Sequence, residues 1–210
     1  MMTVYPRVTE ILQATQSQDT KDRLRRWFLA QQRKGLDPQQ LSNQAKAQGT
    51  HFHQAIEIYL TTGIQPQFVD ILANPQDSLA LQRWRCALPH LQALRHDVLC
   101  LEQAVVSHKL RYQGHLDCLV WDGPCLVVID WKTSQRFKKK AWIEDYFIQA
   151  TAYALAAYEC GVAPVLPEIV KVYVFSPQRT QVFSESVATF GPTWLERLSQ
   201  YQQLVESVTG

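Results

Sequence analysis

Two aspartates and a lysine stand inside apolar, β-branched stretches of the chain, where charged residues are uncommon. Asp117 precedes one such stretch, and Asp130 and Lys132 follow the run Leu-Val-Val-Ile at 126–129. Asp and Lys are poor strand residues, and a buried charge is costly unless it is paired or binds a metal. Hard oxygen ligands of this kind suit Mg²⁺ or Mn²⁺. These residue types therefore predict a divalent-cation site with an ammonium beside it.

The two apolar stretches are expected to form a β-hairpin. Asp-Gly at 122–123 lies between them and is a strong turn signal. Side chains alternate across a strand, so Asp130 and Lys132 share one face and Trp131 takes the other. A tight hairpin would bring Asp117 beside them on the neighbouring strand. The two strands are predicted over residues 112–121 and 124–132.

This arrangement resembles the core of the PD-(D/E)XK nuclease superfamily, and more specifically its RecB-like branch. Three further features carry the resemblance: Gly49-x-x-x-His53-x-x-x-Glu57 upstream, the phrase Asp-Trp-Lys-Thr-Ser at 130–134, and Gln149-x-x-x-Tyr153 downstream. A bare Asp-x-Lys is a weak signal, but the elements in this order are a fairly strong one. Within the branch, the chain is similar to the mitochondrial genome maintenance exonuclease 1 group.

The resemblance implies a restriction-endonuclease-like α/β fold, in which a mixed central β-sheet is flanked by helices and preceded by a helical portion. It also implies a metal site. The ligands carried over are the carboxylates of Asp117 and Asp130, the imidazole of His53 and the main-chain carbonyl of Trp131. Without the resemblance, His53 is more often a core histidine than a ligand.

The same resemblance implies the catalytic roles. Lys132 would position or deprotonate the attacking water and stabilise the transition state, and a lysine base needs a depressed pKa, which desolvation and a nearby metal would supply. Asp117 and Asp130 would hold one or two metal ions at the reacting phosphate. Gln149 and Tyr153 would orient the lysine or the bound strand.

Substrate-binding residues are expected around the end of the second strand. The hydroxyls of Thr133 and Ser134 are placed to donate hydrogen bonds to a phosphate. The basic run that follows is usually just solvated, but after a catalytic strand it also fits phosphate contact, as does a basic residue in the turn before Gly114. These basic candidates are Arg136, Lys138, Lys139 and Arg111.

The other elements follow from apolar periodicity and capping signals. A basic amphipathic helix over 20–34 reads equally well as a solvated face or as a phosphate-contacting wall. Glu102, inside a strand over 98–106, could be an edge charge or an extra metal carboxylate, but we favour a role in supporting the metal site. The next helix begins after an Asp37 cap and is expected to break near Gly49. Further helices are predicted over 79–95, with a kink or end at Pro89, over 142–160 and over 190–207, and strands over 169–176 and 181–187.

A length of 210 residues indicates a single domain. The resemblance implies that it is a RecB-like nuclease domain, in which a mainly helical portion, 1–95, carries His53 and residues 96–210 form the sheet core and the closing helices. The net charge is only +2, so any nucleic-acid surface must be local. We see no signal peptide. Five cysteines without a CxxC pair indicate reduced thiols, and hence a cytoplasmic protein. No cysteines cluster after Cys160, so no iron–sulfur cluster is expected.

These observations predict a metal-dependent DNA exonuclease that processes single-stranded ends in repair, recombination or replication, using Mg²⁺ or Mn²⁺. Its partner is DNA, with no membrane contact, and DNA-processing proteins are candidate partners. Three alternatives stay open. The chain could be a structure-specific or CRISPR-associated RecB-like nuclease, a catalytically silent DNA-binding module, or a scaffold in which the Asp–Lys pair is a structural ion pair.

Overall fold

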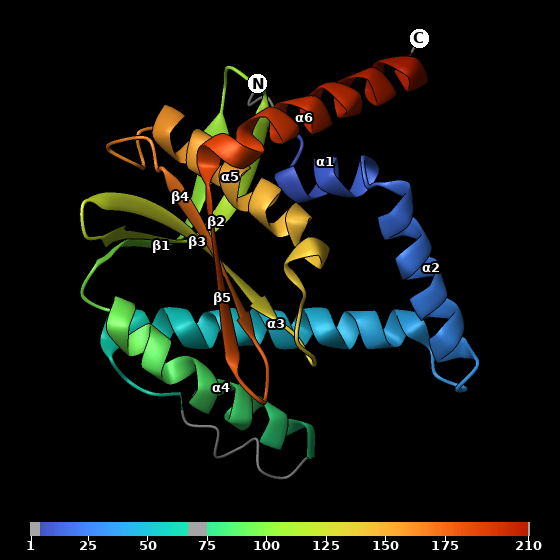
Figure 1. Cartoon of the computed structure of the whole chain (residues 1–210), viewed down its shortest axis with the longest axis vertical. Coiled ribbons are helices and arrows are strands. Elements are labelled where there is room, and N and C mark those ends of the chain that lie inside the picture. Colours follow the sequence, from blue (N-terminus) through green and yellow to red (C-terminus); the bar gives the residue numbers. More distant parts are fainter. Residues whose placement is uncertain (1–4, 67–74, 210) are drawn as a thin grey trace.

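The computed structural model describes residues 5–66 and 75–209, in which helices surround one mixed β-sheet (Figure 1). This architecture confirms the predicted fold class, a mixed sheet flanked by helices and preceded by a helical portion. None of the described helices is long and apolar enough to cross a membrane. In chain order, the elements are α1 (Val8–Ala14), α2 (Gln18–Gln32), α3 (Pro38–Thr62), α4 (Pro75–Leu94), β1 (Val98–Ser107), β2 (Tyr112–Asp122), β3 (Cys125–Thr133), the 3₁₀ turn η2 (Lys140–Trp142), α5 (Glu144–Glu159), β4 (Ile169–Phe175), β5 (Thr180–Ser186) and α6 (Val187–Thr209).

The sheet has five strands in the order β1-β2-β3-β4-β5. Neighbouring strands are antiparallel except β3 and β4, which run parallel. Parallel neighbours need a crossover connection, and α5 supplies it. In Figure 1, α5 and α6 lie on one side of the sheet, while α3 and α4 lie on the other.

The predicted hairpin is formed by β2 and β3. Asp122 pairs with Cys125, so the two turn residues are Gly123 and Pro124, one position later than the sequence signal suggested. Gly123 has a φ of 61°, in the left-handed region that favours glycine. The antiparallel register then carries the strands back towards the acidic residues.

Apolar residues alternate along the central strands and build a separate core on each face. Val128 faces α5 and packs in one cluster with Trp194 of α6. Ile129 faces the opposite way and packs with Phe52 of α3 and Trp84 of α4. Burial of each such side chain contributes about 1.5–3 kcal/mol. The sheet is therefore held between two helical layers that do not share a core.

The helices α3 and α4 differ from expectation in two places. Asp37 caps α3 as predicted, accepting a hydrogen bond of 2.8 Å from the main-chain N–H of Gln39, but α3 continues unbroken past Gly49. α4 begins earlier than expected and Pro89 lies inside it without ending it. Pro89 removes one helical hydrogen bond, and the burial of Leu91 in the core offsets that loss.

Candidate active site

Three carboxylates lie in one row across β1, β2 and β3. In the β1–β2 ladder Leu101 pairs with Cys118, which puts Glu102 opposite Asp117. Asp130 is the next neighbour of Asp117 on β3, just beyond the last pair of that ladder. Asp117 is 8% exposed and Asp130 only 1%. The sheet thus brings the two predicted aspartates together and adds a glutamate to them.

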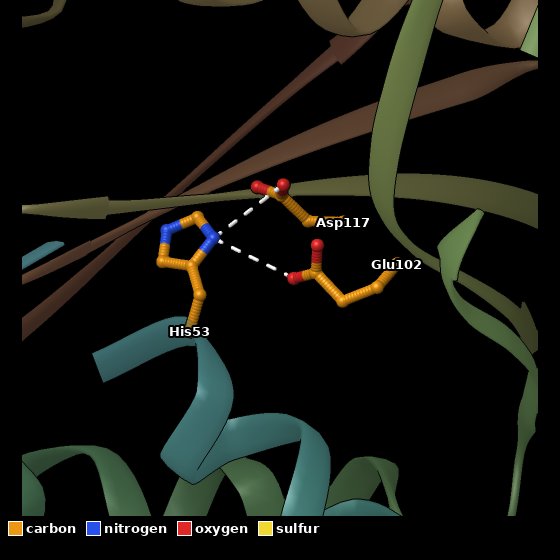
Figure 2. A group of neighbouring side chains, drawn as sticks. All are labelled: His53, Glu102 and Asp117. Atoms are coloured by element: carbon orange, nitrogen blue, oxygen red, sulfur yellow. Dashed lines mark ion pairs between the residues drawn. The ribbon is translucent and has the colours of Figure 1, made fainter. Parts of the chain in front are cut away.

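α3 places the His53 imidazole over this row (Figure 2). Its Nδ1 lies 3.5 Å from Asp117 Oδ1 and 3.6 Å from Glu102 Oε1. One ligand atom from each of the three residues lies within 4.8 Å of the others. On the other side of the ring, Nε2 lies 3.0 Å from the Trp131 carbonyl oxygen. Two of the four predicted metal ligands, His53 and Asp117, therefore meet at one point together with Glu102, and the Trp131 carbonyl lies at the opposite nitrogen of the imidazole.

Glu102 is the ligand candidate that the sequence left open. Its second oxygen lies 3.3 Å from His115 Nδ1, so the carboxylate bridges two imidazoles. Its φ of 44° is rare for a residue with a side chain and costs on the order of 1–2 kcal/mol. This geometry favours the interpretation as an extra metal carboxylate over that as an edge charge. The available signal was a lone acidic residue inside an apolar strand.

The fourth predicted ligand, Asp130, has two very different oxygens. Oδ1 accepts hydrogen bonds from Lys132 Nζ at 2.6 Å and from Gln149 Nε2 at 3.1 Å. Oδ2 is buried and has no hydrogen-bond partner within the described ranges. A buried carboxylate oxygen without a donor is costly. An oxygen of this kind, beside two more carboxylates and an imidazole, fits a hard divalent cation.

α5 supplies the other wall of the site. The Gln149 amide, which holds Asp130, also donates to the Tyr153 hydroxyl at 3.1 Å. The Tyr153 ring lies against the main chain of Gly114, where an added Cβ would be only 2.3 Å from Cε1. The close approach of strand and ring thus requires glycine at this position, and both residues of the predicted Gln149–Tyr153 pair face the aspartates.

Tyr146 belongs to the same wall and was not singled out by the sequence. Lys132 Nζ lies 5.2 Å from the centre of its ring, within the range of a cation–π contact. Tyr146 precedes Gln149 by three residues and Tyr153 by seven, a spacing that puts all three on one helix face. This spacing was the sequence signal that could have identified Tyr146 as a site residue.

Charge coupling shifts the pKa values of the site in opposite directions. Burial alone would lower the pKa of His53, but its contacts with Asp117 and Glu102 raise it to about 10. Burial raises the pKa of Asp130 to about 6, although Lys132 opposes this shift. For Asp117, burial acts upwards, but His53 and Lys132 hold its pKa below the usual range.

Lys132 does not follow the expected direction. Burial lowers its pKa, but the charges of Asp130 and Asp117 outweigh burial and raise it above the ordinary lysine value. The expected depression of its pKa relied on desolvation together with a nearby metal, and among the protein groups alone the two carboxylates outweigh desolvation. Lys132 is an ammonium held against Asp130.

The residues after Lys132 lie at the edge of the site. Thr133 Oγ1 is 3.5 Å from the Cβ position of Gly49, an ordinary contact, so α3 does not need a glycine there to approach β3. The Ser134 hydroxyl donates to the carbonyl of Arg136 at 2.6 Å and thereby shapes the turn that follows. Arg136 itself is exposed.

The remaining basic candidates for phosphate contact lie in two places, the loop after β3 and a separate cavity. The Gln181 side chain of β5 bonds both the main-chain N–H and the carbonyl of Lys138, at 2.8 and 3.0 Å, and so fixes this loop. Lys139 Nζ lies 5.3 Å from the centre of the Trp142 ring. Arg111 is not brought to the site, because it lines a different cavity beside Leu198 of α6.

α2 packs only loosely on the rest of the protein. It has no buried residue, and its Ser17 cap accepts a hydrogen bond from the main-chain N–H of Thr20. Arg23, which pairs with Asp19 at 3.4 Å, is close enough to Lys138 to help lower the pKa of that lysine, whose burial has the larger effect. The basic helix and the basic loop therefore lie near each other, and Figure 1 shows α2 beside the end at which α3 begins.

Comparison with known proteins identifies the family of the chain. Mitochondrial genome maintenance exonuclease 1 of Homo sapiens is 29% identical over 95% of this chain, and that of Xenopus tropicalis is 30% identical over 96%. The chain spans only 59% and 58% of the length of these two relatives. The crystal structure of SSO0001 has a TM-score of 0.40 and 13% identity, over 72% of this chain and 70% of that one, a likeness too weak to add to the assignment. The model of the PD-(D/E)XK nuclease superfamily matches residues 15–209, and the chain belongs to that superfamily.

Proposed function

We propose that this protein is a metal-dependent exonuclease that hydrolyses phosphodiester bonds at single-stranded DNA ends, in repair, recombination or replication. One observation carries the proposal: the group His53–Glu102–Asp117 stands directly beside the Asp130–Lys132 pair. Membership of a nuclease superfamily supports the reaction class. The similarity to proteins named exonucleases supports action at ends.

The donor set suits Mg²⁺ or Mn²⁺. Asp117, Glu102 and His53 would hold the ion, with Asp130 Oδ2 as a further donor. The Trp131 carbonyl, the other predicted ligand, contacts the opposite nitrogen of His53 and would have to exchange that contact to join them. A divalent ion bound here lowers the pKa of a coordinated water and neutralises charge on the phosphate.

The protein groups divide the remaining work. Lys132, kept protonated by the carboxylates, faces the developing negative charge of the phosphate, where a fixed cation in a water-poor site is effective. Gln149 and Tyr146 hold Lys132 and its partner Asp130 in place. Thr133 and Ser134 lie where a bound strand would pass, and Ser134 is available once its bond within the loop is exchanged.

Single-stranded DNA fits the surface around the site. Lys138, Lys139 and Arg136 follow β3, and the aromatic rings of Phe137 and Trp142 are exposed between them. Alternation of cations and exposed rings suits a flexible strand whose bases can stack. A stiff duplex offers no unstacked bases to such rings.

The deciding experiment uses purified protein with Mn²⁺ or Mg²⁺ on end-labelled linear single strands, linear duplex and circular single strands. Lys132→Ala is compared with Lys171→Ala, a lysine of β4 that is paired with Asp122 at the surface. We expect degradation of linear single strands only, lost in Lys132→Ala and kept in Lys171→Ala.

Other results would select other functions. Cutting of circles would make the protein an endonuclease. DNA binding without metal-dependent cleavage would make it a silent binding module. Absence of Mn²⁺ binding would leave the Asp130–Lys132 pair as a structural ion pair.

A further inference from the structure

A cavity of about 430 Å³ lies beside the candidate site, on the side away from α3. Its walls come from the start of α1, from β1, from β2 and from α5. We infer that this cavity is a subsite for a single nucleotide of the bound strand, in which Arg7 holds the phosphate. The inference rests on the proposed function, because the nucleotide in question is the neighbour of the scissile phosphate.

Two of the cavity residues connect it to the site. His115 lines this cavity and also the cavity of about 410 Å³ in front of His53 and Glu102. Tyr153 lines it from α5 and reaches Asp130 through the Gln149 amide. The cavity therefore touches both halves of the site. A strand lying across the carboxylates has this space next to it.

The walls have the mixed character of a nucleotide site. Ala104 and Gly114 form an apolar surface, while Thr9, Gln113 and His115 provide polar groups at the rim. Small-molecule pockets usually combine a mainly apolar lining with a few placed polar groups, in volumes of about 300–1,000 Å³. At about 430 Å³, the cavity has room for one nucleotide and not for a duplex.

Arg7 is the cation of this cavity. No carboxylate within residues 5–66 and 75–209 forms an ion pair with it, and its side chain is exposed. A guanidinium binds phosphate with two parallel hydrogen bonds. An arginine that lines a cavity without an acidic partner is thus free for an anionic ligand.

The segment that carries Arg7 is fixed to the sheet. The main-chain N–H of Gln113 donates to the Pro6 carbonyl at 3.0 Å, and Arg7 forms a β-bridge with Gln113. The Gln113 side chain also donates to the Tyr5 carbonyl. The wall is therefore a short added strand on β2, which gives the cavity a defined shape before any ligand binds.

The test is direct binding of deoxynucleoside monophosphates, measured by ligand-observed NMR on the full chain without metal. Four probes are compared: a 5′-monophosphate, a 3′-monophosphate, the nucleoside and inorganic phosphate. Arg7→Ala removes the cation, and Ala104→Phe fills the space from an exposed position. We expect at least one monophosphate to bind, about tenfold more weakly to Arg7→Ala, as for loss of a charged hydrogen bond, and not to Ala104→Phe.

A second cavity of similar size provides matched controls. It measures about 380 Å³ and has one lysine and one exposed alanine, Lys21 and Ala14, in its lining. Lys21→Ala and Ala14→Phe should bind the monophosphates as the wild type does. Unchanged melting temperatures in all four variants show that each one folds.

Several results would overturn the inference. The first is unchanged monophosphate binding by Ala104→Phe, and the second is absence of monophosphate binding to the wild type. The third is inorganic phosphate that binds as tightly as the monophosphates and whose binding does not change in Ala104→Phe. The proposed function fails separately, because it depends on cleavage by the metal-loaded protein. Cleavage without monophosphate binding would rule out the subsite and leave the proposed nuclease activity standing. Monophosphate binding without cleavage would rule out the proposed activity and leave a nucleotide-binding cavity.

Discussion

The main-chain N–H of Trp131 donates a hydrogen bond of 2.7 Å to Asp117 Oδ2. The carbonyl of the same residue lies 3.0 Å from His53 Nε2. One residue of β3 thus holds a carboxylate of β2 and an imidazole of α3. The Trp131 side chain is buried and packs edge-on against Tyr173 at 5.2 Å between ring centres. The metal-site candidates are therefore positioned by backbone atoms that the core keeps still.

Asp117→Asn separates the charge of this residue from its structural bond. The asparagine oxygen still accepts from the Trp131 N–H, so the fold should persist, while the negative charge next to His53 is lost. We expect Mn²⁺ affinity to fall by about 10- to 100-fold or more, with cleavage lost in parallel. Calorimetric Mn²⁺ titration checks this. Asp122→Asn, on the same strand at the surface, is the control, and equal Mn²⁺ affinity of both variants would contradict the assignment.

Tyr146→Leu removes the ring that faces the Lys132 ammonium. A cation–π contact in a desolvated site contributes about 2 kcal/mol, so we expect kcat to fall by up to roughly thirtyfold. Tyr146→Phe keeps the ring and should retain nearly full activity. Single-turnover cleavage by the two variants gives the comparison. Equal losses in both would show that the hydroxyl matters and not the ring.

Gly114→Ala tests the close approach of β2 to α5. The new methyl group would lie 2.3 Å from Tyr153 Cε1, so the ring must move away from Gln149. We expect a loss of about 1–3 kcal/mol in unfolding free energy, together with lower activity. Gly191→Ala in α6 is the control, since apart from its chain neighbours nothing lies within 4 Å of its added Cβ, and it should lose less stability than Gly114→Ala and keep full activity. Urea unfolding measures both.

Glu159 predicts a pH dependence of stability away from the site. Slight burial acts to raise its pKa, but hydrogen bonds from the Ser107 hydroxyl and the Lys109 main-chain N–H lower it overall. A carboxyl group with a lowered folded-state pKa stabilises the fold above its unfolded pKa, and this contribution is lost as the pH falls through the folded value. The wild type should therefore exceed Glu159→Gln in unfolding free energy at neutral pH and lose that advantage in acid. A difference that is constant with pH would contradict this.

The sequence was sufficient for the hairpin at the centre of the site. Alternation along a strand has a period of two, so the positions of Asp117, Asp130 and Lys132 relative to the turn nearly determine their faces. A turn at 122–123 would place Asp117 opposite Val128, on the same face as Asp130 but one pair away, and the turn one residue later brings the two aspartates opposite each other. The local pattern of β2 and β3 thus predicts their contact, because the partners are close in sequence.

The rest of the site depends on contacts that are distant in sequence. Glu102 meets Asp117 through a strand pairing and an uncommon φ value, and neither can be read from the residues of β1 alone. His53 lies 78 residues before Trp131, and only the family resemblance pointed to it. The direction of the Lys132 pKa shift among the protein groups likewise depends on whether burial or the two carboxylates dominate. That balance depends on the distances from the Lys132 ammonium to the carboxylates, which only the folded structure gives.

The separation of the two cores has a consequence for how the protein loses activity. His53 is carried by the layer of α3 and α4, whereas Gln149 and Tyr153 are carried by α5 on the opposite face. Proteins open in parts, at a lower free energy than complete unfolding. Release of the α3–α4 layer would withdraw the imidazole while the Asp130–Lys132 pair stayed in place. Activity would then disappear at urea concentrations lower than those that unfold the sheet. Catalysis therefore reports whether both helical layers are packed on the sheet.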